Sequence, residues 1–339
     1  MDKNFHILTF ILCISLLSAQ DKVKQFDLDY SGKKIDNSLY TSIKLLDSRE
    51  DTSNMGIVRI GMLNKEAVVL PNGSFLIQLN NLLSKINGVG AQKKELLFQL
   101  RRLKFVEKAE GGKEFGYCFF RANLFTGIQS EYKLISSIDT FLVVEAKDVT
   151  KPLLEEANKT IGIFLRRALT KNFSYGSVLS LNEIVKIDSI EKLNIRVYNV
   201  SEYVDGVYTN FEAFKNQTPN YALFSITFED GEITELKAKS RKGKVKRMKS
   251  DNVYAIVNKG KPYISAEFGY YPLVKNNNDF YFIGDDKINY LKDQVVKSNS
   301  FFNPTEYVYS PFPLTSTYEI KIDHVNGKFM RVKEIKGTN

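Results

Sequence analysis

Residues Tyr221–Ile283 read YALFSITFEDGEITELKAKSRKGKVKRMKSDNVYAIVNKGKPYISAEFGYYPLVKNNNDFYFI. Short aromatic and β-branched runs alternate in this stretch with Asp-Gly, Lys-Gly and Asn-rich segments. Such alternation is typical of antiparallel strands joined by tight turns. We therefore predict a β-rich meander domain over residues 201–285.

The first half of the chain shows a different pattern. Strand-like runs over residues 39–70 precede a helical spacing of apolar residues over 75–86. Longer strand-like runs follow. Arg101 and Arg102 interrupt the first of them, which suggests a β-bulge or a sheet edge there, and an amphipathic helix begins at Thr150. This order predicts the fold class α+β: an N-terminal, mainly antiparallel sheet with two helices on one face, followed by the β-rich meander domain.

The amino terminus predicts export. Lys3 precedes an apolar run from Ile7 to Leu17, and Ser18-Ala19 offers a cleavage site, as in a secretory signal peptide. The run is shorter than the roughly 20 residues that a spanning helix needs, and no later segment is long and apolar enough. We therefore expect no transmembrane span after signal cleavage, and an exported protein of the periplasm or the cell surface.

These patterns divide the chain into six segments. A polar stretch follows the signal peptide; its Asp27 could open a calcium loop, but the twelfth position is Ser38 instead of an acidic residue. Asn326-Gly327 predicts a hairpin near the end. The predicted segments are a signal peptide 1–20, a polar linker 21–37, an α+β domain 38–172, a connector 173–200, a β-meander domain 201–285 and a C-terminal extension with a terminal hairpin 286–339.

Residue types common in catalytic and metal sites are scarce. After signal cleavage Cys118 and His324 are the only residues of their types, whereas zinc sites usually draw on several. Cys118 lies among aromatic residues and is expected to be buried. His324 is expected on the surface near the terminal turn, with Asp323 pointing to the opposite face. We therefore predict a protein that is not an enzyme, with no catalytic residue, no metal ligand and no cofactor.

A dense basic cluster interrupts the meander, and a turn at Gly243 would place it on a hairpin. Such a hairpin could bind an anionic glycan, a lipid or a protein. Nucleic acid is disfavoured, because no aromatic residue is interleaved among the cations to stack on bases. The alternative is an edge hairpin protected from aggregation and partly neutralised by the acidic residues of 229–235. The candidate anion-binding residues are Lys237, Lys239, Arg241, Lys242, Lys244, Lys246, Arg247 and Lys249.

A resemblance adds to this interpretation. The stretch LLDSREDTSNMGIV, with Asp47, Arg49 and Gly56, resembles an α+β module of outer-membrane lipoproteins and of the amino-terminal domain of TolB-type periplasmic proteins. Residues 204–219, 252–264 and 268–284 are similar to a domain of uncharacterised exported bacterial proteins. The resemblance implies a two-domain exported protein and brings no catalytic residue.

Three functions are consistent with these observations. The first is a non-catalytic exported envelope protein with a binding or scaffolding role, whose partner is an unknown envelope protein. The second is a binding module for an anionic glycan or lipid that acts through the 237–249 basic hairpin. The third is a hydrolase that uses the carboxylates Asp47, Glu50 and Asp51, although these lie in a charged loop with Arg49, as in an ordinary solvated loop.

Overall fold

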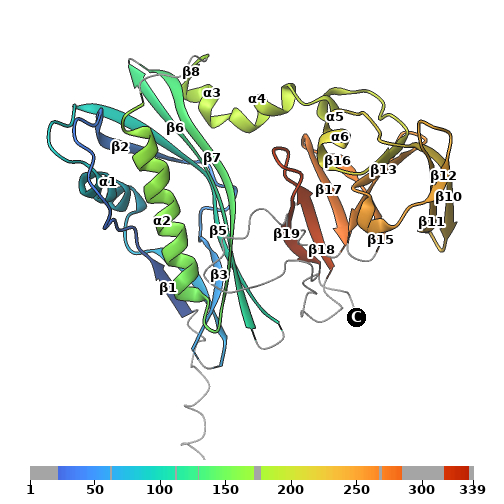
Figure 1. Cartoon of the computed structure of the whole chain (residues 1–339), viewed down its shortest axis with the longest axis horizontal. Coiled ribbons are helices and arrows are strands. Elements are labelled where there is room, and N and C mark those ends of the chain that lie inside the picture. Colours follow the sequence, from blue (N-terminus) through green and yellow to red (C-terminus); the bar gives the residue numbers. More distant parts are fainter. Residues whose placement is uncertain are drawn as a thin grey trace, which may run out of the picture. The chain divides into compact units, whose positions relative to one another are not determined.

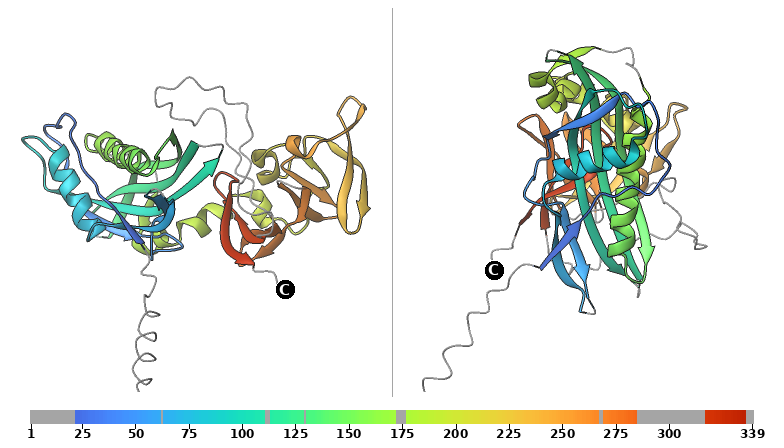
Figure 2. Two further views of the ribbon diagram at one scale, coloured as in Figure 1. Left: turned by 90° about the horizontal axis from the view of Figure 1, so that it is seen from below. Right: turned by 90° about the vertical axis from the view of Figure 1, so that its left-hand side faces the viewer.

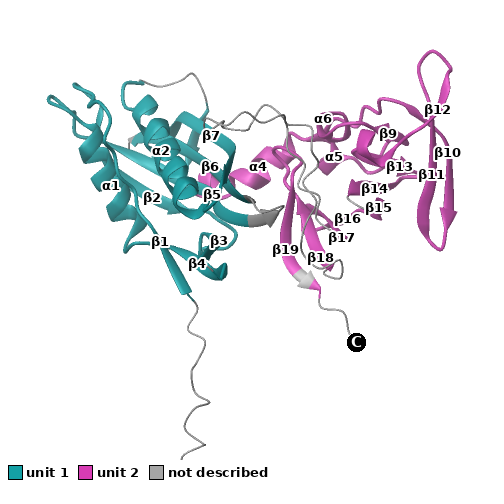
Figure 3. Ribbon diagram, turned by 60° about the horizontal axis from the view of Figure 1, so that its bottom comes forward, with its two compact units in different colours: residues 1–181, 292–305 teal, residues 182–291, 306–339 magenta. Residues whose placement is uncertain are grey.

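A computed structural model describes residues 22–61, 63–110, 113–128, 130–171, 177–266, 269–284 and 317–335. The chain divides into two compact units, which Figure 3 colours separately: residues 1–181 with 292–305, and residues 182–291 with 306–339. The predicted signal peptide, residues 1–20, lies outside the described residues. None of the described helices combines the length and the apolar character needed to cross a membrane.

Unit 1 is built on one curled, eight-stranded sheet (Figures 1 and 2). The strand order is β1-β4-β3-β5-β6-β7-β8, and β2 pairs with β5 beside β3. The long strands β5, β6 and β7 form an antiparallel meander, and the register shift between Leu100 and Arg102 confirms the predicted bulge. The strands are β1 (Lys22–Phe26), β2 (Tyr40–Asp47), β3 (Gly56–Ile60), β4 (Lys65–Pro71), β5 (Lys94–Glu110), β6 (Lys113–Ile128), β7 (Glu131–Ala146) and β8 (Val178–Ser180).

The predicted α+β fold class, with a mainly antiparallel N-terminal sheet, is wrong. The sheet is mixed, because β1 runs parallel to β4 and both β2 and β3 run parallel to β5. Strands make up 50% of the structure and helices 21%, so the protein is β-rich throughout and not a two-helix α+β domain followed by a β domain. Local alternation in the sequence identified strands, but it carries no information on the direction in which distant strands pair.

Two helices, α1 (Phe75–Ile86) and α2 (Thr150–Ala168), share one apolar core with the sheet. Each presents a stripe of buried residues at helical spacing, such as Leu79 and Leu83 on α1. On α2 the ring of Phe164 meets Phe98 and Phe120 edge-on, with centroids 6.2 and 6.0 Å apart. Each buried side chain of this size contributes about 1.5–3 kcal/mol to folding.

The segment predicted as a polar linker, residues 21–37, contains β1. Residues 22–26 add a parallel strand to β4, and Phe26 is buried against the ring of Phe105, with centroids 5.2 Å apart. Leu28 is also buried, and its backbone N–H donates to Gln78 Oε1 over 2.7 Å. The strand reads as polar because it lies at an edge of the sheet, where most of its side chains face solvent.

The described residues of unit 2 form three small sheets, ordered β10-β11-β12, β15-β14-β13-β9 and β16-β17-β18-β19. Two apolar clusters hold these sheets and the short helices together. The elements are α3 (Leu181–Val185), α4 (Ile187–Leu193), α5 (Arg196–Asn199), β9 (Gly206–Tyr208), α6 (Phe211–Lys215), β10 (Ala222–Glu229), β11 (Glu232–Lys239), β12 (Val245–Arg247), the 3₁₀ helix η1 (Ser250–Asn252), β13 (Ala255–Asn258), β14 (Lys261–Ala266), β15 (Gly269–Pro272), β16 (Val274–Asn276), β17 (Asp279–Gly284), β18 (Thr317–Ile322) and β19 (Phe329–Ile335).

The antiparallel strands predicted over 221–283 form with two of their predicted turns, but they are divided among three small sheets and do not make one meander. The β10–β11 turn uses Asp230 and Gly231, whose φ values are 50° and 86°, and the β13–β14 turn uses Lys259 and Gly260 at 51° and 71°. Left-handed backbone at both central positions is the geometry that matches the twist of a two-residue hairpin. The Asp-Gly and Lys-Gly pairs therefore predicted the turns correctly, because the conformation of a tight turn depends on the residues within it.

The segments predicted as a connector and an extension both contribute to unit 2. Ile195, Val197 and Tyr198 of the predicted connector are buried in its core. The predicted terminal hairpin forms as β18 and β19, and β18 pairs with β17 in the same sheet. The rest of the predicted extension, residues 286–316 and 336–339, lies outside the described residues.

Candidate functional site

The eight candidate anion-binding residues lie on β11, on β12 and on the segments that follow each strand. Lys237 and Arg247 contact Glu235, at 2.9 and 3.8 Å. The hydrogen bond from Lys237, together with the charge of Arg247, lowers the pKa of the Glu235 carboxyl. Lys246 lies 4.3 Å from the centroid of the Tyr221 ring, so it makes a cation–π contact.

The other cations of the cluster are exposed. In the part of the chain that the structure describes, no carboxylate forms an ion pair with any of them. They lie on the last residue of β11, on the β11–β12 turn, and just after β12. These residues are Lys239, Arg241, Lys242, Lys244 and Lys249.

The acidic residues upstream lie at the opposite end of the same sheet. Glu229 and Glu232 face one another across the β10–β11 turn, with Asp230 at its tip. The eight residues of β11 separate this acidic end from the basic turn by about 25 Å, at ~3.3 Å per residue. Of the acidic residues in 229–235, Glu235 is the one that the structure shows paired with the basic cluster, and the sheet has one acidic end and one basic end.

The inner face of β11 is apolar and its outer face carries charge. Ile233, Leu236 and Ala238 are buried in the cluster between this sheet and its neighbour, while Lys237 and Lys239 alternate with them. β12 is a three-residue edge strand, so the alternative role of the lysines, protection against edge-to-edge aggregation, is also consistent with this structure.

Two of the loop carboxylates of the third hypothesis, Asp47 and Asp51, are engaged within their own loop. Asp47 makes a bidentate pair with Arg49, whose Nη2 lies 2.7 Å from Oδ2, and Arg49 Nη1 donates to Asn54 O over 2.7 Å. Asp51 accepts hydrogen bonds from the N–H and the hydroxyl of Ser53, and these lower its pKa. The lowered pKa of Asp51 and its exposure to solvent do not favour Asp51 as a general acid.

A hollow beside α1 in unit 1 is lined by Asp27, Ser74, Gln78 and Lys85, among others. Its buried amide is already satisfied, since Gln78 Nε2 donates to Phe26 O and Asn72 O. Lys85 pairs with Asp29 at the rim. These groups leave no polar atom of Gln78 directed at a ligand.

Cys118 is fully buried in the core of unit 1, as predicted, and burial raises the pKa of its thiol. A protonated, enclosed thiol is unreactive.

The prediction of a surface His324 is wrong. Its side chain is 5% exposed, and its Nε2 forms a 2.8 Å hydrogen bond with Glu191 Oε2 of α4. The partner residues are 133 positions apart in the sequence. The neighbouring Asp323 is also buried, and its Oδ1 accepts the N–H of Val325 within the β18–β19 turn.

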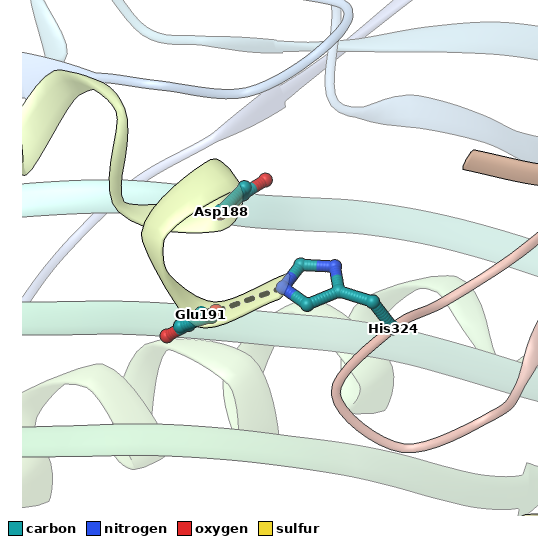
Figure 4. Close-up of side chains that lie close together, drawn as sticks. All are labelled: Asp188, Glu191 and His324. Carbon is teal, nitrogen blue, oxygen red and sulfur yellow. Dashed lines mark hydrogen bonds and ion pairs between the residues drawn. The ribbon is translucent and has the colours of Figure 1, made fainter. Parts of the chain in front are cut away.

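Asp188 completes a group of three side chains around this contact (Figure 4). Asp188 and Glu191 project from neighbouring turns of α4, and His324 faces them from the β18–β19 turn. One ligand atom from each residue lies within 4.8 Å of the other two. The spacing i, i+3 puts two positions on one face of a helix, which is why both carboxylates can meet the imidazole.

Lys192, the residue of α4 that follows Glu191, belongs to a buried network of ion pairs. Lys192 Nζ contacts Asp279 Oδ1 at 2.6 Å, and Lys321 Nζ contacts Asp279 Oδ2 at 3.1 Å. The side chains are 8%, 11% and 15% exposed for Lys192, Asp279 and Lys321. Tyr198 packs near them, and burial followed by the charge of Asp279 raises the pKa of its hydroxyl.

Sequence reasoning missed this polar centre of unit 2. Asp188 and Glu191 show one local signal, the i, i+3 spacing of two acids in a helical segment, but such spacing is common on solvated helices. Nothing local indicates that His324 returns to meet them. The group becomes visible only when β18 pairs with β17 and brings the turn to α4.

Comparisons with known proteins identify no family. No family model matches the chain, and no curated protein matches it. Among solved structures, the chain is similar to the crystal structure of a Xanthomonas campestris protein of the DUF330 family, with a TM-score of 0.26 and 8% sequence identity. That similarity covers 44% of this chain and 91% of the other.

Proposed function

We propose that the protein is a non-catalytic exported protein of the bacterial cell envelope that binds an anionic ligand through the basic end of the β10–β11–β12 sheet. The observation that carries this proposal is the separation of charge along β11. Four exposed cations, Lys239, Arg241, Lys242 and Lys244, gather at one end without ion pairs among the described residues, and three acidic residues lie at the other. Unpaired surface cations of this density attract anionic surfaces.

The ligand class follows from the same geometry. The turn at 240–244 and the ends of its strands form an exposed, charged tip, which suits a repeating anion such as an acidic polysaccharide or a layer of anionic headgroups. The absence of an aromatic residue between Lys237 and Lys249 still disfavours nucleic acid.

The exported location rests on the amino-terminal sequence. The apolar run from Ile7 to Leu17 and the small residues after it have the form of a signal peptide. The resemblance to two-domain exported proteins of the periplasm or cell surface agrees with it. Fractionation of the source cells should place the processed protein in the envelope or the medium, and a cytoplasmic, unprocessed protein would contradict this part of the proposal.

A binding experiment with two arms distinguishes the ligand sources. The first arm measures binding to vesicles with anionic headgroups against vesicles of zwitterionic lipid. The second measures binding to an acidic polysaccharide against a neutral one. We expect binding in one anionic arm that weakens as salt rises, because exposed charges are screened beyond about 10 Å at 0.1 M ionic strength. Absence of salt-sensitive binding in both anionic arms would refute the anion-binding function.

A further inference from the structure

The group Asp188, Glu191 and His324 has the composition of a metal site. It supplies two carboxylates and one imidazole, all of them ligands that Zn²⁺ accepts in proteins. Three protein ligands with a fourth position left for water is a common arrangement for this ion. In Figure 4 the two acidic side chains leave one short helix and the imidazole approaches from a separate turn, so the ligands come from two segments of the fold.

We propose that Asp188, Glu191 and His324 bind a Zn²⁺ ion in unit 2. The proposal is independent of the anion-binding function, because it uses none of the basic cluster. Charge favours the ion, since two carboxylates neutralise Zn²⁺ and a neutral imidazole completes the set. The mixed ligand set also favours a borderline ion over Mg²⁺ or Ca²⁺, which prefer oxygen ligands alone.

The distances allow the site to close with small movements. Zn²⁺ bonds of about 2.0–2.2 Å place tetrahedral ligand atoms roughly 3.4 Å apart. The 2.8 Å contact between His324 Nε2 and Glu191 Oε2 would open slightly, and the metal would replace the hydrogen that joins them. Other separations reach at most 4.8 Å, and the exposed side chain of Asp188 can approach by a rotamer change.

The three side chains of the site differ in burial: the imidazole is buried and the two carboxylates are accessible to solvent. The side chain of His324 is 5% exposed, so the surrounding turn holds its ring in place. The side chain of Glu191 is 34% exposed and Asp188 lies at the surface, so an ion has a path from solvent. Binding would join α4 to the β18–β19 turn, and unit 2 should therefore become more stable when Zn²⁺ is present.

The test is a titration of the purified, untagged full chain with Zn²⁺ by isothermal calorimetry, alongside thermal unfolding with and without the ion. We expect one ion per chain and a higher Tm with Zn²⁺. Asp188→Asn and His324→Gln should each weaken binding at least about 10-fold, the scale on which altered zinc sites lose affinity, and should remove the Tm increase.

The control is Glu155→Gln on α2. Glu155 makes an exposed i, i+4 pair with Lys151 in unit 1, and the substitution removes one surface carboxylate, as Asp188→Asn does. We expect it to leave Zn²⁺ affinity unchanged. Because Asp188 is exposed, Asp188→Asn tests the site even if His324→Gln does not fold. Unchanged affinity in Asp188→Asn, or a loss of the same size in Glu155→Gln, would overturn the proposal, as would a wild-type chain that binds no Zn²⁺.

Discussion

Replacing Asp279 by Asn should destabilise unit 2 by about 3–5 kcal/mol, the usual cost of removing one partner from a buried ion pair. Asp279 is the carboxylate that both Lys192 and Lys321 contact, at 2.6 and 3.1 Å. With 8% and 15% of their side chains exposed, the two ammonium groups are largely withdrawn from water. Removing the carboxylate takes away the negative charge that both ammonium groups contact, while the size of the side chain is preserved.

The magnitude translates into a measurable shift. For a folding unit of roughly 150 residues, 1 kcal/mol corresponds to about 2–4 °C in Tm, so we expect a loss of roughly 6–20 °C. Circular dichroism measures the shift in Tm. Because the chain has two units, hydrogen exchange measured by mass spectrometry is then needed to show which unit has lost stability. Peptides from β17 and β18 should lose protection, and peptides from β5 and β6 of unit 1 should keep theirs.

Two further variants make the result interpretable. Asp230→Asn makes the same chemical change on the exposed β10–β11 turn and should alter stability by less than about 0.5 kcal/mol. The double variant Lys192→Met with Asp279→Asn removes one buried cation as well, and it should recover part of the lost stability. Equal stability of Asp279→Asn and Asp230→Asn would refute the reasoning.

Two other predictions concern unit 1. Glu107 Oε2 accepts the N–H of Arg59, and burial raises the pKa of the Glu107 carboxyl in the folded chain above its pKa in the unfolded chain. The charged carboxylate therefore destabilises the fold at a pH above the folded-state pKa, and this cost disappears as the pH falls to the unfolded-state pKa. Glu107→Gln should raise stability at pH 7 but not at pH 4 in urea titrations; a gain of equal size at both pH values would count against it. At Gly56 φ is +104° and a Cβ would lie 2.0 Å from Phe105 O, so Gly56→Ala should cost more than about 4 kcal/mol. Gly73→Ala, also at positive φ but with no atom within 4 Å, should cost about 1–2 kcal/mol, and similar losses in both would show that crowding at Gly56 is unimportant.

Local features of the fold were predictable from the sequence. The turn at Asp230-Gly231, the bulge at Arg101 and the helix over 75–86 each depend on residues close together in the chain. The direction of strand pairing was not, because β1 selects β4 as a parallel partner about 45 residues away. Once such parallel pairs join the long antiparallel meander, the sheet is mixed and the predicted class fails.

The candidate sites divide in the same way. The basic cluster is continuous in sequence, so its place on a hairpin followed from one turn at Gly243. Which acidic residue of 229–235 pairs with the basic cluster depended on strand register, because register decides which charged side chains face one another. The register places Glu235 beside the cluster. The burial of His324 depended on Glu191, 133 residues earlier, and composition suggested instead an isolated surface imidazole.

The central claim, that the basic end of the β10–β11–β12 sheet binds an anionic ligand, is tested most directly by one affinity comparison at low salt. The anionic ligand is the one that binds the wild-type protein. The variant Arg241→Glu, Lys242→Glu, Lys244→Glu is compared with Lys34→Glu, Lys65→Glu, Lys147→Glu, which makes the same change in net charge on exposed lysines of unit 1. At about 1 kcal/mol per cation near an anionic surface, the hairpin variant should bind at least about 100-fold more weakly than wild type, and the unit 1 variant far less so. Equal losses in the two variants would mean that net charge, and not the basic hairpin, causes the binding, and would contradict the proposed function.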